Sequence, residues 1–122
     1  AFARALATEP AVLLMDEPLG SLDEITRTSI RYELLRIWEA SRQTVVLVTH
    51  SISEAVMMSD RVVVLSSRPG KVVGQVPIDL PRPREEALER TPEFLKQADR
   101  VKELLALGTK RTATAGGARA WV

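Results

Sequence analysis

Three ionisable side chains follow two short apolar runs of the sequence, and they are the residues best suited to catalysis. Asp16 and Glu17 come directly after the apolar residues 11–15, and His50, the single histidine of the chain, follows residues 44–48 closely. Two adjacent carboxylates at the end of a buried strand are costly unless something uses their charge. Holding a magnesium ion is one such use, and acting as a general base is another. The structural alternative is that the carboxylates only solvate a strand end and that the histidine only flanks a helix.

The surrounding elements predict a β–α–β unit. Residues 11–15 (AVLLM) form a continuous apolar run, which is typical of a strand buried on both faces. The Ser-Leu-Asp-Glu sequence at residues 21–24 predicts a capping box with Ser21 at the cap, and a helix that ends near Ser41. Residues 44–48, rich in β-branched side chains, predict a second strand.

Such a crossover determines where the ionisable residues should lie. Two parallel strands joined by a helix end at the same edge of the sheet, so Asp16, Glu17 and His50 are expected together there. That edge is where open α/β sheets bind ligands. Ser21 and Asp23 lie in the intervening turn, where a structural role as turn and cap residues is sufficient.

The second half of the chain predicts a short helix, a hairpin and a longer helix. Ser51 and Glu54 form another capping box, which opens a helix to about Met58. Residues 61–65 predict a third strand, and residues 71–76 are expected to return as its antiparallel partner.

A proline-rich linker and a helix should follow the hairpin. Three prolines at positions 77, 81 and 83 interrupt the pattern, and Arg82 and Arg84 between and after them are expected to be solvated. Thr91 with Pro92 predicts the start of a helix, and Gly108 its end. From position 109 onward the absence of acidic residues and the low apolar content predict a disordered tail.

Composition excludes several classes of protein. The 122 residues suit one domain, with 45% apolar and 27% charged residues as in globular proteins. The absence of cysteine excludes disulfides and thiolate metal sites. The net charge of +1 gives no indication of nucleic-acid binding, and no apolar run approaches the roughly 20 residues of a membrane span. No secretory signal opens the sequence, and no GxxxxGK[ST] phosphate loop occurs in it.

Taken in order, the motifs resemble those of the ATP-binding subunit of ABC transporters. Residues 12–18 (VLLMDEP) resemble the Walker B segment with its following glutamate, residues 20–23 (GSLD) the D-loop, and residues 48–51 (VTHS) the switch-histidine loop. Residues 1–7 resemble the helix that follows the signature motif. The sequences RVVVLSSRPGKVV and LPRPR are similar to the branch that imports nitrate, alkanesulfonates and taurine.

The resemblance implies a partial P-loop NTPase (ABC-type) α/β core with parallel strands, a terminal antiparallel hairpin and a C-terminal helix. It implies that Asp16 binds Mg²⁺, that Glu17 is the general base, and that His50 contacts the γ-phosphate of ATP. It further implies that Ser21 and Asp23 communicate across a dimer interface with the opposite nucleotide site.

By the same resemblance the partners would be transmembrane permease subunits, a second ATPase subunit that forms a homodimer with the first and, indirectly, a periplasmic or extracellular substrate-binding protein, with no nucleic acid. The chain would act at the cytoplasmic face of the membrane as a peripheral protein. Residues 1–80 are expected to be the C-terminal part of the ATPase domain, 81–108 a linker and helix, and 109–122 a tail.

The family's phosphate loop, Q-loop glutamine and signature motif are expected to precede Ala1, so the chain is interpreted as a fragment that is inactive alone. One alternative is an ABC ATPase outside transport. The other is a non-enzymatic α/β binding module in which Asp16, Glu17 and His50 are structural.

Overall fold

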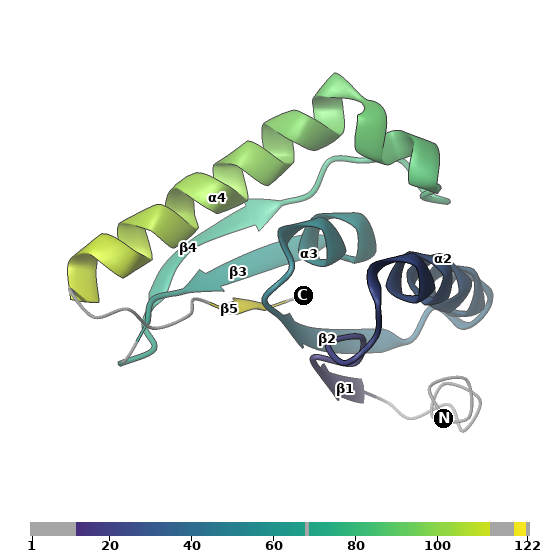
Figure 1. Ribbon diagram of the computed structural model, residues 1–122, viewed down its shortest axis with the longest axis horizontal. Helices are drawn as coiled ribbons and strands as arrows, with labels where there is room; N and C mark the ends of the chain where they lie inside the picture. The colour runs from purple at the N-terminus through teal and green to yellow at the C-terminus, as the bar shows by residue number, and fades with distance from the viewer. Residues whose placement is uncertain (1–11, 68, 113–118, 122) are drawn as a thin grey trace.

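The computed structural model describes residues 12–67, 69–112 and 119–121, which form a mixed α/β fold built on a five-stranded sheet of order β1-β2-β5-β3-β4 (Figure 1). The predicted fold class is confirmed, while residues 1–7, which resemble the helix after the signature motif, lie outside the described residues. In chain order the elements are β1 (Val12–Asp16), α2 (Glu24–Ser41), β2 (Thr44–Thr49), α3 (Ile52–Met58), β3 (Arg61–Leu65), β4 (Val72–Pro77), the 3₁₀ helix η1 (Glu86–Arg90), α4 (Pro92–Thr112) and β5 (Arg119–Trp121).

The predicted β–α–β unit is present as β1, α2 and β2. β1 pairs with β2 in parallel, from Val12 opposite Thr44 to Asp16 opposite Val48. Both strands therefore end at the same edge of the sheet, and the loops after them start side by side. This register is the feature that brings the two groups of ionisable residues together.

β1 differs from the prediction that it is buried on both faces. It is an edge strand among the described elements, and its side chains alternate between exposed and half-buried. Leu14 is 73% exposed, whereas Leu13 on the other face packs against the small core cluster of Leu19 and Leu34. The prediction fails for one face because no described helix covers it.

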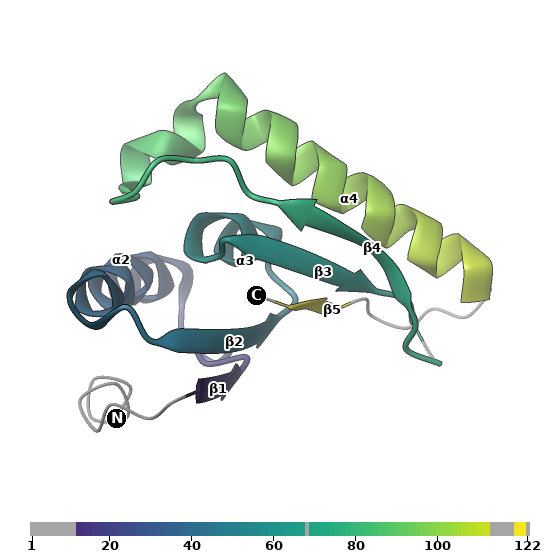
Figure 2. The ribbon, with the colours of Figure 1, turned by 180° about the vertical axis from the view of Figure 1, so that it is seen from behind.

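The main core lies between the β3–β4 hairpin and the helices α3 and α4. The antiparallel pairing of β3 and β4 is as predicted, and α4 runs along this hairpin in both views (Figures 1 and 2). Met57 is fully buried in this core. The buried side chains of this cluster are Ala55, Val56, Met57, Val62, Val64, Val76, Ile78, Leu80, Phe94 and Val101.

Gly108 does not end the last helix, which continues to Thr112. A Cβ at Gly108 would lie 3.1 Å from the Cα of Ser66 and 3.1 Å from Cγ2 of Val73. Glycine is therefore explained by the close approach of α4 to the hairpin, not by a helix-terminating turn. The start of the helix is as predicted, since the backbone amide of Phe94 donates to Oγ1 of Thr91 at 3.3 Å.

The C-terminal segment also contributes to the sheet. The composition predicts disorder from Thr109, but residues 109–112 continue α4 and residues 119–121 form β5. β5 lies between β2 and β3 and pairs antiparallel with both, as the view from behind shows (Figure 2). Tertiary pairing thus overrides the weak local signal in this segment.

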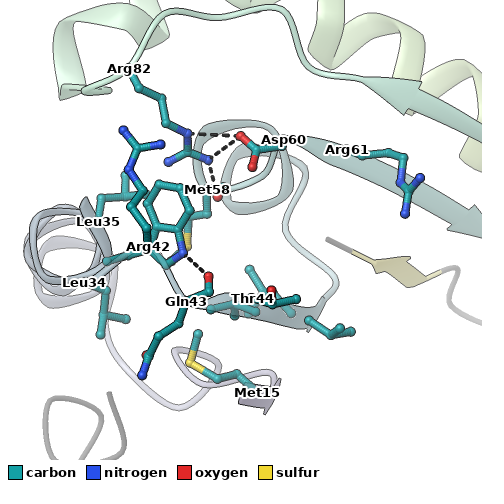
Figure 3. A pocket seen from close by; sticks show the side chains of 14 residues that line it. Met15, Leu34, Leu35, Arg42, Gln43, Thr44, Met58, Asp60, Arg61 and Arg82 are labelled. Carbon is teal, nitrogen blue, oxygen red and sulfur yellow. Dashed lines mark hydrogen bonds and ion pairs between the residues drawn. The ribbon is translucent and has the colours of Figure 1, made fainter. Parts of the chain in front are cut away.

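The arginines of the proline-rich segment are not solvated as predicted. Arg82 donates to Oδ1 of Asp60 and to the carbonyl of Met58, each at 3.1 Å (Figure 3), and its guanidinium lies 4.2 Å from the ring centroid of Trp38. Arg84 is 5% exposed and donates to the carbonyls of Val56, Met57, Ser59 and Leu80. These contacts bind the segment to the C-terminal end of α3, whose last carbonyls lack partners within the helix.

Tyr32 of α2 connects this helix to η1 and provides a pH-dependent contribution to stability. Its hydroxyl donates to Oε2 of Glu89, and burial, reinforced by the Glu89 carboxylate, raises the pKa of the Tyr32 hydroxyl. Above pH 10, the ordinary pKa of tyrosine, the unfolded chain loses this proton while the folded chain keeps it. The free energy of unfolding should therefore fall as the pH rises above that value.

Replacing Tyr32 by phenylalanine is expected to remove this pH dependence. At neutral pH the variant should lose about 1 kcal/mol of stability with the hydrogen bond, and the difference from wild type should shrink as the pH rises above about 10. Denaturant unfolding at pH 8 and near pH 11 measures both effects. A difference that is the same at both pH values would contradict the assignment.

Candidate functional site

Glu17 and His50 meet at the edge of the sheet where β1 and β2 end. Nε2 of His50 lies 2.5 Å from Oε1 of Glu17, and the two side chains are 50% and 39% exposed. The backbone amide of Glu17 donates to the carbonyl of Val48 at 2.7 Å, which continues the β1–β2 pairing into the loop. The carboxylate and the imidazole thus form a contact that remains accessible to a ligand.

The backbone of Glu17 is strained. Its φ is +46°, in the left-handed region that residues other than glycine rarely adopt. Such a conformation costs on the order of 1–3 kcal/mol and is often found at active sites and ligand clamps. The turn that imposes it continues through a hydrogen bond from the amide of Gly20 to the carbonyl of Glu17 at 3.1 Å.

Asp16 is exposed at the last position of β1, next to Glu17. No group of three or more His, Cys, Asp or Glu side chains that could hold a metal ion occurs within residues 12–67, 69–112 and 119–121. A single carboxylate nevertheless suits Mg²⁺, which takes one or two carboxylates and completes its shell with water and substrate phosphates.

Asp23, not Ser21, caps helix α2. Oδ1 of Asp23 accepts from the amide of Thr26 at 2.8 Å and Oδ2 from its hydroxyl at 2.9 Å, and these bonds lower the pKa of the Asp23 carboxyl. The predicted capping box is therefore wrong at this helix. Two tight turns extend the loop: one is closed by the bond from the Gly20 amide to the Glu17 carbonyl, the other by a bond from the Leu22 amide to the Leu19 carbonyl. These turns leave Ser21 exposed before the helix begins.

Glu17 and His50 line a cavity of about 320 Å³. Two charged residues that the sequence motifs did not indicate as site residues also line it: Arg27 of α2, which is half-buried, and Glu54 of α3, which is buried. The position of Glu54 in the Ser51 capping box was the available signal, but a capping role explained it fully. Arg27 gave no signal, since an arginine on a helix is usually solvated.

A larger cavity, of about 670 Å³, lies at the beginning of β2 and near the C-terminal end of α2 (Figure 3). Met15, Thr44, Arg61 and Arg82 are among the residues that line it. It contains neither Glu17 nor His50.

Within the part of the chain that the structure describes, no helix is long and apolar enough to cross a membrane.

The geometry defines an α/β protein with an acid–histidine site at the carboxyl edge of two parallel strands. No family model matches the chain. It is 49% identical over 106 residues to an uncharacterized ABC transporter ATP-binding protein of Methanocaldococcus jannaschii, and 48% identical over 92 residues to a nitrate import ATP-binding protein of Synechococcus elongatus. An aliphatic sulfonates import ATP-binding protein of Bacillus cereus is 44% identical over 97 residues.

Over most of its length the chain is homologous to ATP-binding proteins of ABC transporters, of the type that includes nitrate and sulfonate importers. The resemblance inferred from the sequence motifs is confirmed. The matches cover 86%, 73% and 80% of this chain, in the same order, but only 38%, 34% and 39% of the relatives. The chain thus spans well under half the length of the curated relatives it matches.

Proposed function

We propose that the chain is part of the ATP-hydrolysing subunit of an ABC importer for a small molecule of the nitrate, sulfonate or taurine kind. The contact between Nε2 of His50 and Oε1 of Glu17 carries the proposal, because it unites a base and a second polar group at one sheet edge. The names of the relatives from Synechococcus and Bacillus support import of such molecules.

In this proposal Glu17 accepts a proton from the water that attacks the γ-phosphate of ATP. His50 contacts the γ-phosphate and orients that water, and the exposed Asp16 would hold Mg²⁺ directly or through water. Phosphoryl transfer depends mainly on positioning and on stabilising the charge of the phosphate oxygens. The metal ion supplies charge neutralisation, while Glu17 and His50 supply proton acceptance and alignment.

The partners follow from the same proposal. Ser21 is exposed at the turn before α2, where it could contact a second ATPase subunit. Asp23 would act from the same turn, although its carboxylate already caps the helix. The subunit would bind transmembrane permease subunits at the cytoplasmic face of the membrane as a peripheral protein, and a substrate-binding protein would deliver the cargo from the other side.

The chain would supply the water-activating side of the nucleotide site without its phosphate cradle. Its length relative to the homologues and the lack of a GxxxxGK[ST] loop support this view. Residues 1–80 would complete an ATPase domain and 81–108 would append a linker and helix. The complete subunit would be a longer protein that contains this sequence together with the phosphate loop.

The test is Mg²⁺-dependent hydrolysis of ATP by the complete subunit. We expect hydrolysis with Mg²⁺, its loss when the metal is chelated, and its recovery when Mg²⁺ is restored. The 122-residue chain alone should show no hydrolysis under the same conditions. A complete subunit that binds ATP but never hydrolyses it, alone or with its permease, would overturn the proposal.

A further inference from the structure

Glu54 is a buried carboxylate that contacts Thr49, beside His50, and Arg27, which binds the loop after Glu17. It is 4% exposed, and it lies in the first turn of α3, four residues after His50. A buried charge is costly unless it is paired and hydrogen-bonded, so its contacts indicate what it does. They run in two directions.

The first direction leads to the backbone on either side of His50. Oγ1 of Thr49 donates to Oε2 of Glu54 at 2.6 Å and accepts from the amide of Ser51 at 3.0 Å. In an ordinary capping box the glutamate would bind the Ser51 amide itself. Here the Thr49 hydroxyl lies between them, so the carboxylate holds Thr49 directly and the Ser51 amide through Thr49.

The second direction leads to the loop that follows Glu17. Nε of Arg27 lies 4.0 Å from Oε1 of Glu54 and donates to the carbonyl of Leu19 at 3.1 Å. Nη2 of Arg27 donates to the carbonyl of Leu22 at 2.9 Å. A guanidinium offers several donors in a rigid plane, which suits it to hold two carbonyls of a turn at once.

A second arginine adds positive charge beside the carboxylate. Nη2 of Arg31 lies 4.0 Å from Oε1 of Glu54, and its Nη1 lies 3.4 Å from Oε1 of Glu89. Arg31 is itself 3% exposed, so the attraction acts with little solvent screening. The Glu54 carboxylate thus has one oxygen on the Thr49 hydroxyl and the other near both guanidinium groups.

We propose that Glu54 is a positioning residue, which holds His50 through Thr49 and the Glu17 loop through Arg27 so that base and histidine stay aligned. This inference rests on the proposed ATPase function and extends it to residues that do not touch the substrate. Misplacement of reacting groups by about 1 Å can cost on the order of 10²-fold in rate. Glu54 should therefore act on the chemical step and leave ATP binding unchanged.

The test compares Glu54→Gln, Glu54→Ala and Thr49→Val in the complete subunit. We expect the turnover number to fall about 10-fold in Glu54→Gln, which keeps an acceptor for Thr49, and about 10²-fold in Glu54→Ala. Thr49→Val keeps the shape and should resemble Glu54→Gln. The KM for ATP should stay within about twofold in all three. Glu33→Gln, at an exposed position of α2, is the matched control and should leave turnover unchanged.

A background with Glu17→Gln distinguishes failure of the positioning role of Glu54 from failure of the proposed ATPase function. If Glu54 acts by aligning the base, Glu54→Ala should add no further loss in that background, because the aligned group is already gone. Equal turnover per folded molecule in Glu54→Ala, Thr49→Val and wild type would overturn the inference. An unaffected Glu17→Gln would instead overturn the proposed function. If Glu54→Ala fails to fold, Thr49→Val decides.

Discussion

Replacing Glu17 by glutamine in the complete subunit is expected to slow ATP hydrolysis by about 10²- to 10⁴-fold, the range that general-base catalysis contributes. Glutamine keeps the volume of the side chain and a polar atom for His50, and it adopts φ = +46° at about the same cost as glutamate. The variant should therefore fold normally and bind ATP with unchanged affinity. Single-turnover hydrolysis and ATP binding measured on the same preparation test the two statements separately.

A double-mutant cycle with His50→Ala tests whether the 2.5 Å contact has a catalytic meaning. If carboxylate and imidazole act as one unit on the attacking water, the double variant should be no slower than the slower single variant. Fully additive effects would show that the two side chains act independently. A Glu17→Gln variant as fast as Glu33→Gln would contradict the assignment of the base.

Replacing Arg84 by methionine is expected to destabilise the fold by about 2–4 kcal/mol, because several buried carbonyls lose their donor at once. The side chain is 1% exposed, and Nη1 reaches the carbonyls of Val56 and Met57 at 3.3 Å. Burial, with a further contribution from Arg82, lowers the pKa of Arg84 to about 10. The Arg84 guanidinium thus stays charged at neutral pH, and its contribution to the free energy of unfolding should be constant from about pH 5 to 8.

The matched control is Arg100→Met at an exposed position of α4, which removes the same charge. Denaturant unfolding of the complete subunit should show a lower midpoint for Arg84→Met and no change for the control. Arg84→Lys should fall between wild type and Arg84→Met, because an ammonium group lacks the planar fork that reaches carbonyls on both sides. A midpoint for Arg84→Met equal to that of Arg100→Met would show that the hydrogen bonds from Arg84 to these carbonyls do not stabilise the fold.

Much of the fold could be predicted because its local signals agree with its tertiary structure. The apolar runs predicted the strands, and the Thr91 cap predicted the start of α4. The β–α–β order predicted the parallel pairing of β1 with β2. The failures occur where contacts distant in sequence decide the outcome. Gly108 stays in α4 because of the hairpin beside it, and residues 119–121 form a strand because a position between β2 and β3 accepts them.

The candidate site was likewise predictable in part. Parallel register alone brings Glu17 to His50, so topology was enough to predict their proximity. Arg27 and Glu54 were missed as site residues, and Arg84 was wrongly predicted to be solvated, because their burial depends on which carbonyls and carboxylates surround them. Charged residues are mostly exposed, so one sequence gives no reason to choose the few that are buried.

Because of the left-handed backbone at Glu17, a substitution that raises the thermostability of the protein can abolish its turnover. Glycine adopts that conformation without penalty, so Glu17→Gly should relieve roughly 1 kcal/mol of strain while deleting the proposed base. A directed-evolution screen that rewards only resistance to heat would then enrich inactive clones at this codon. Engineering of a more thermostable variant should therefore select for ATP hydrolysis and heat resistance together.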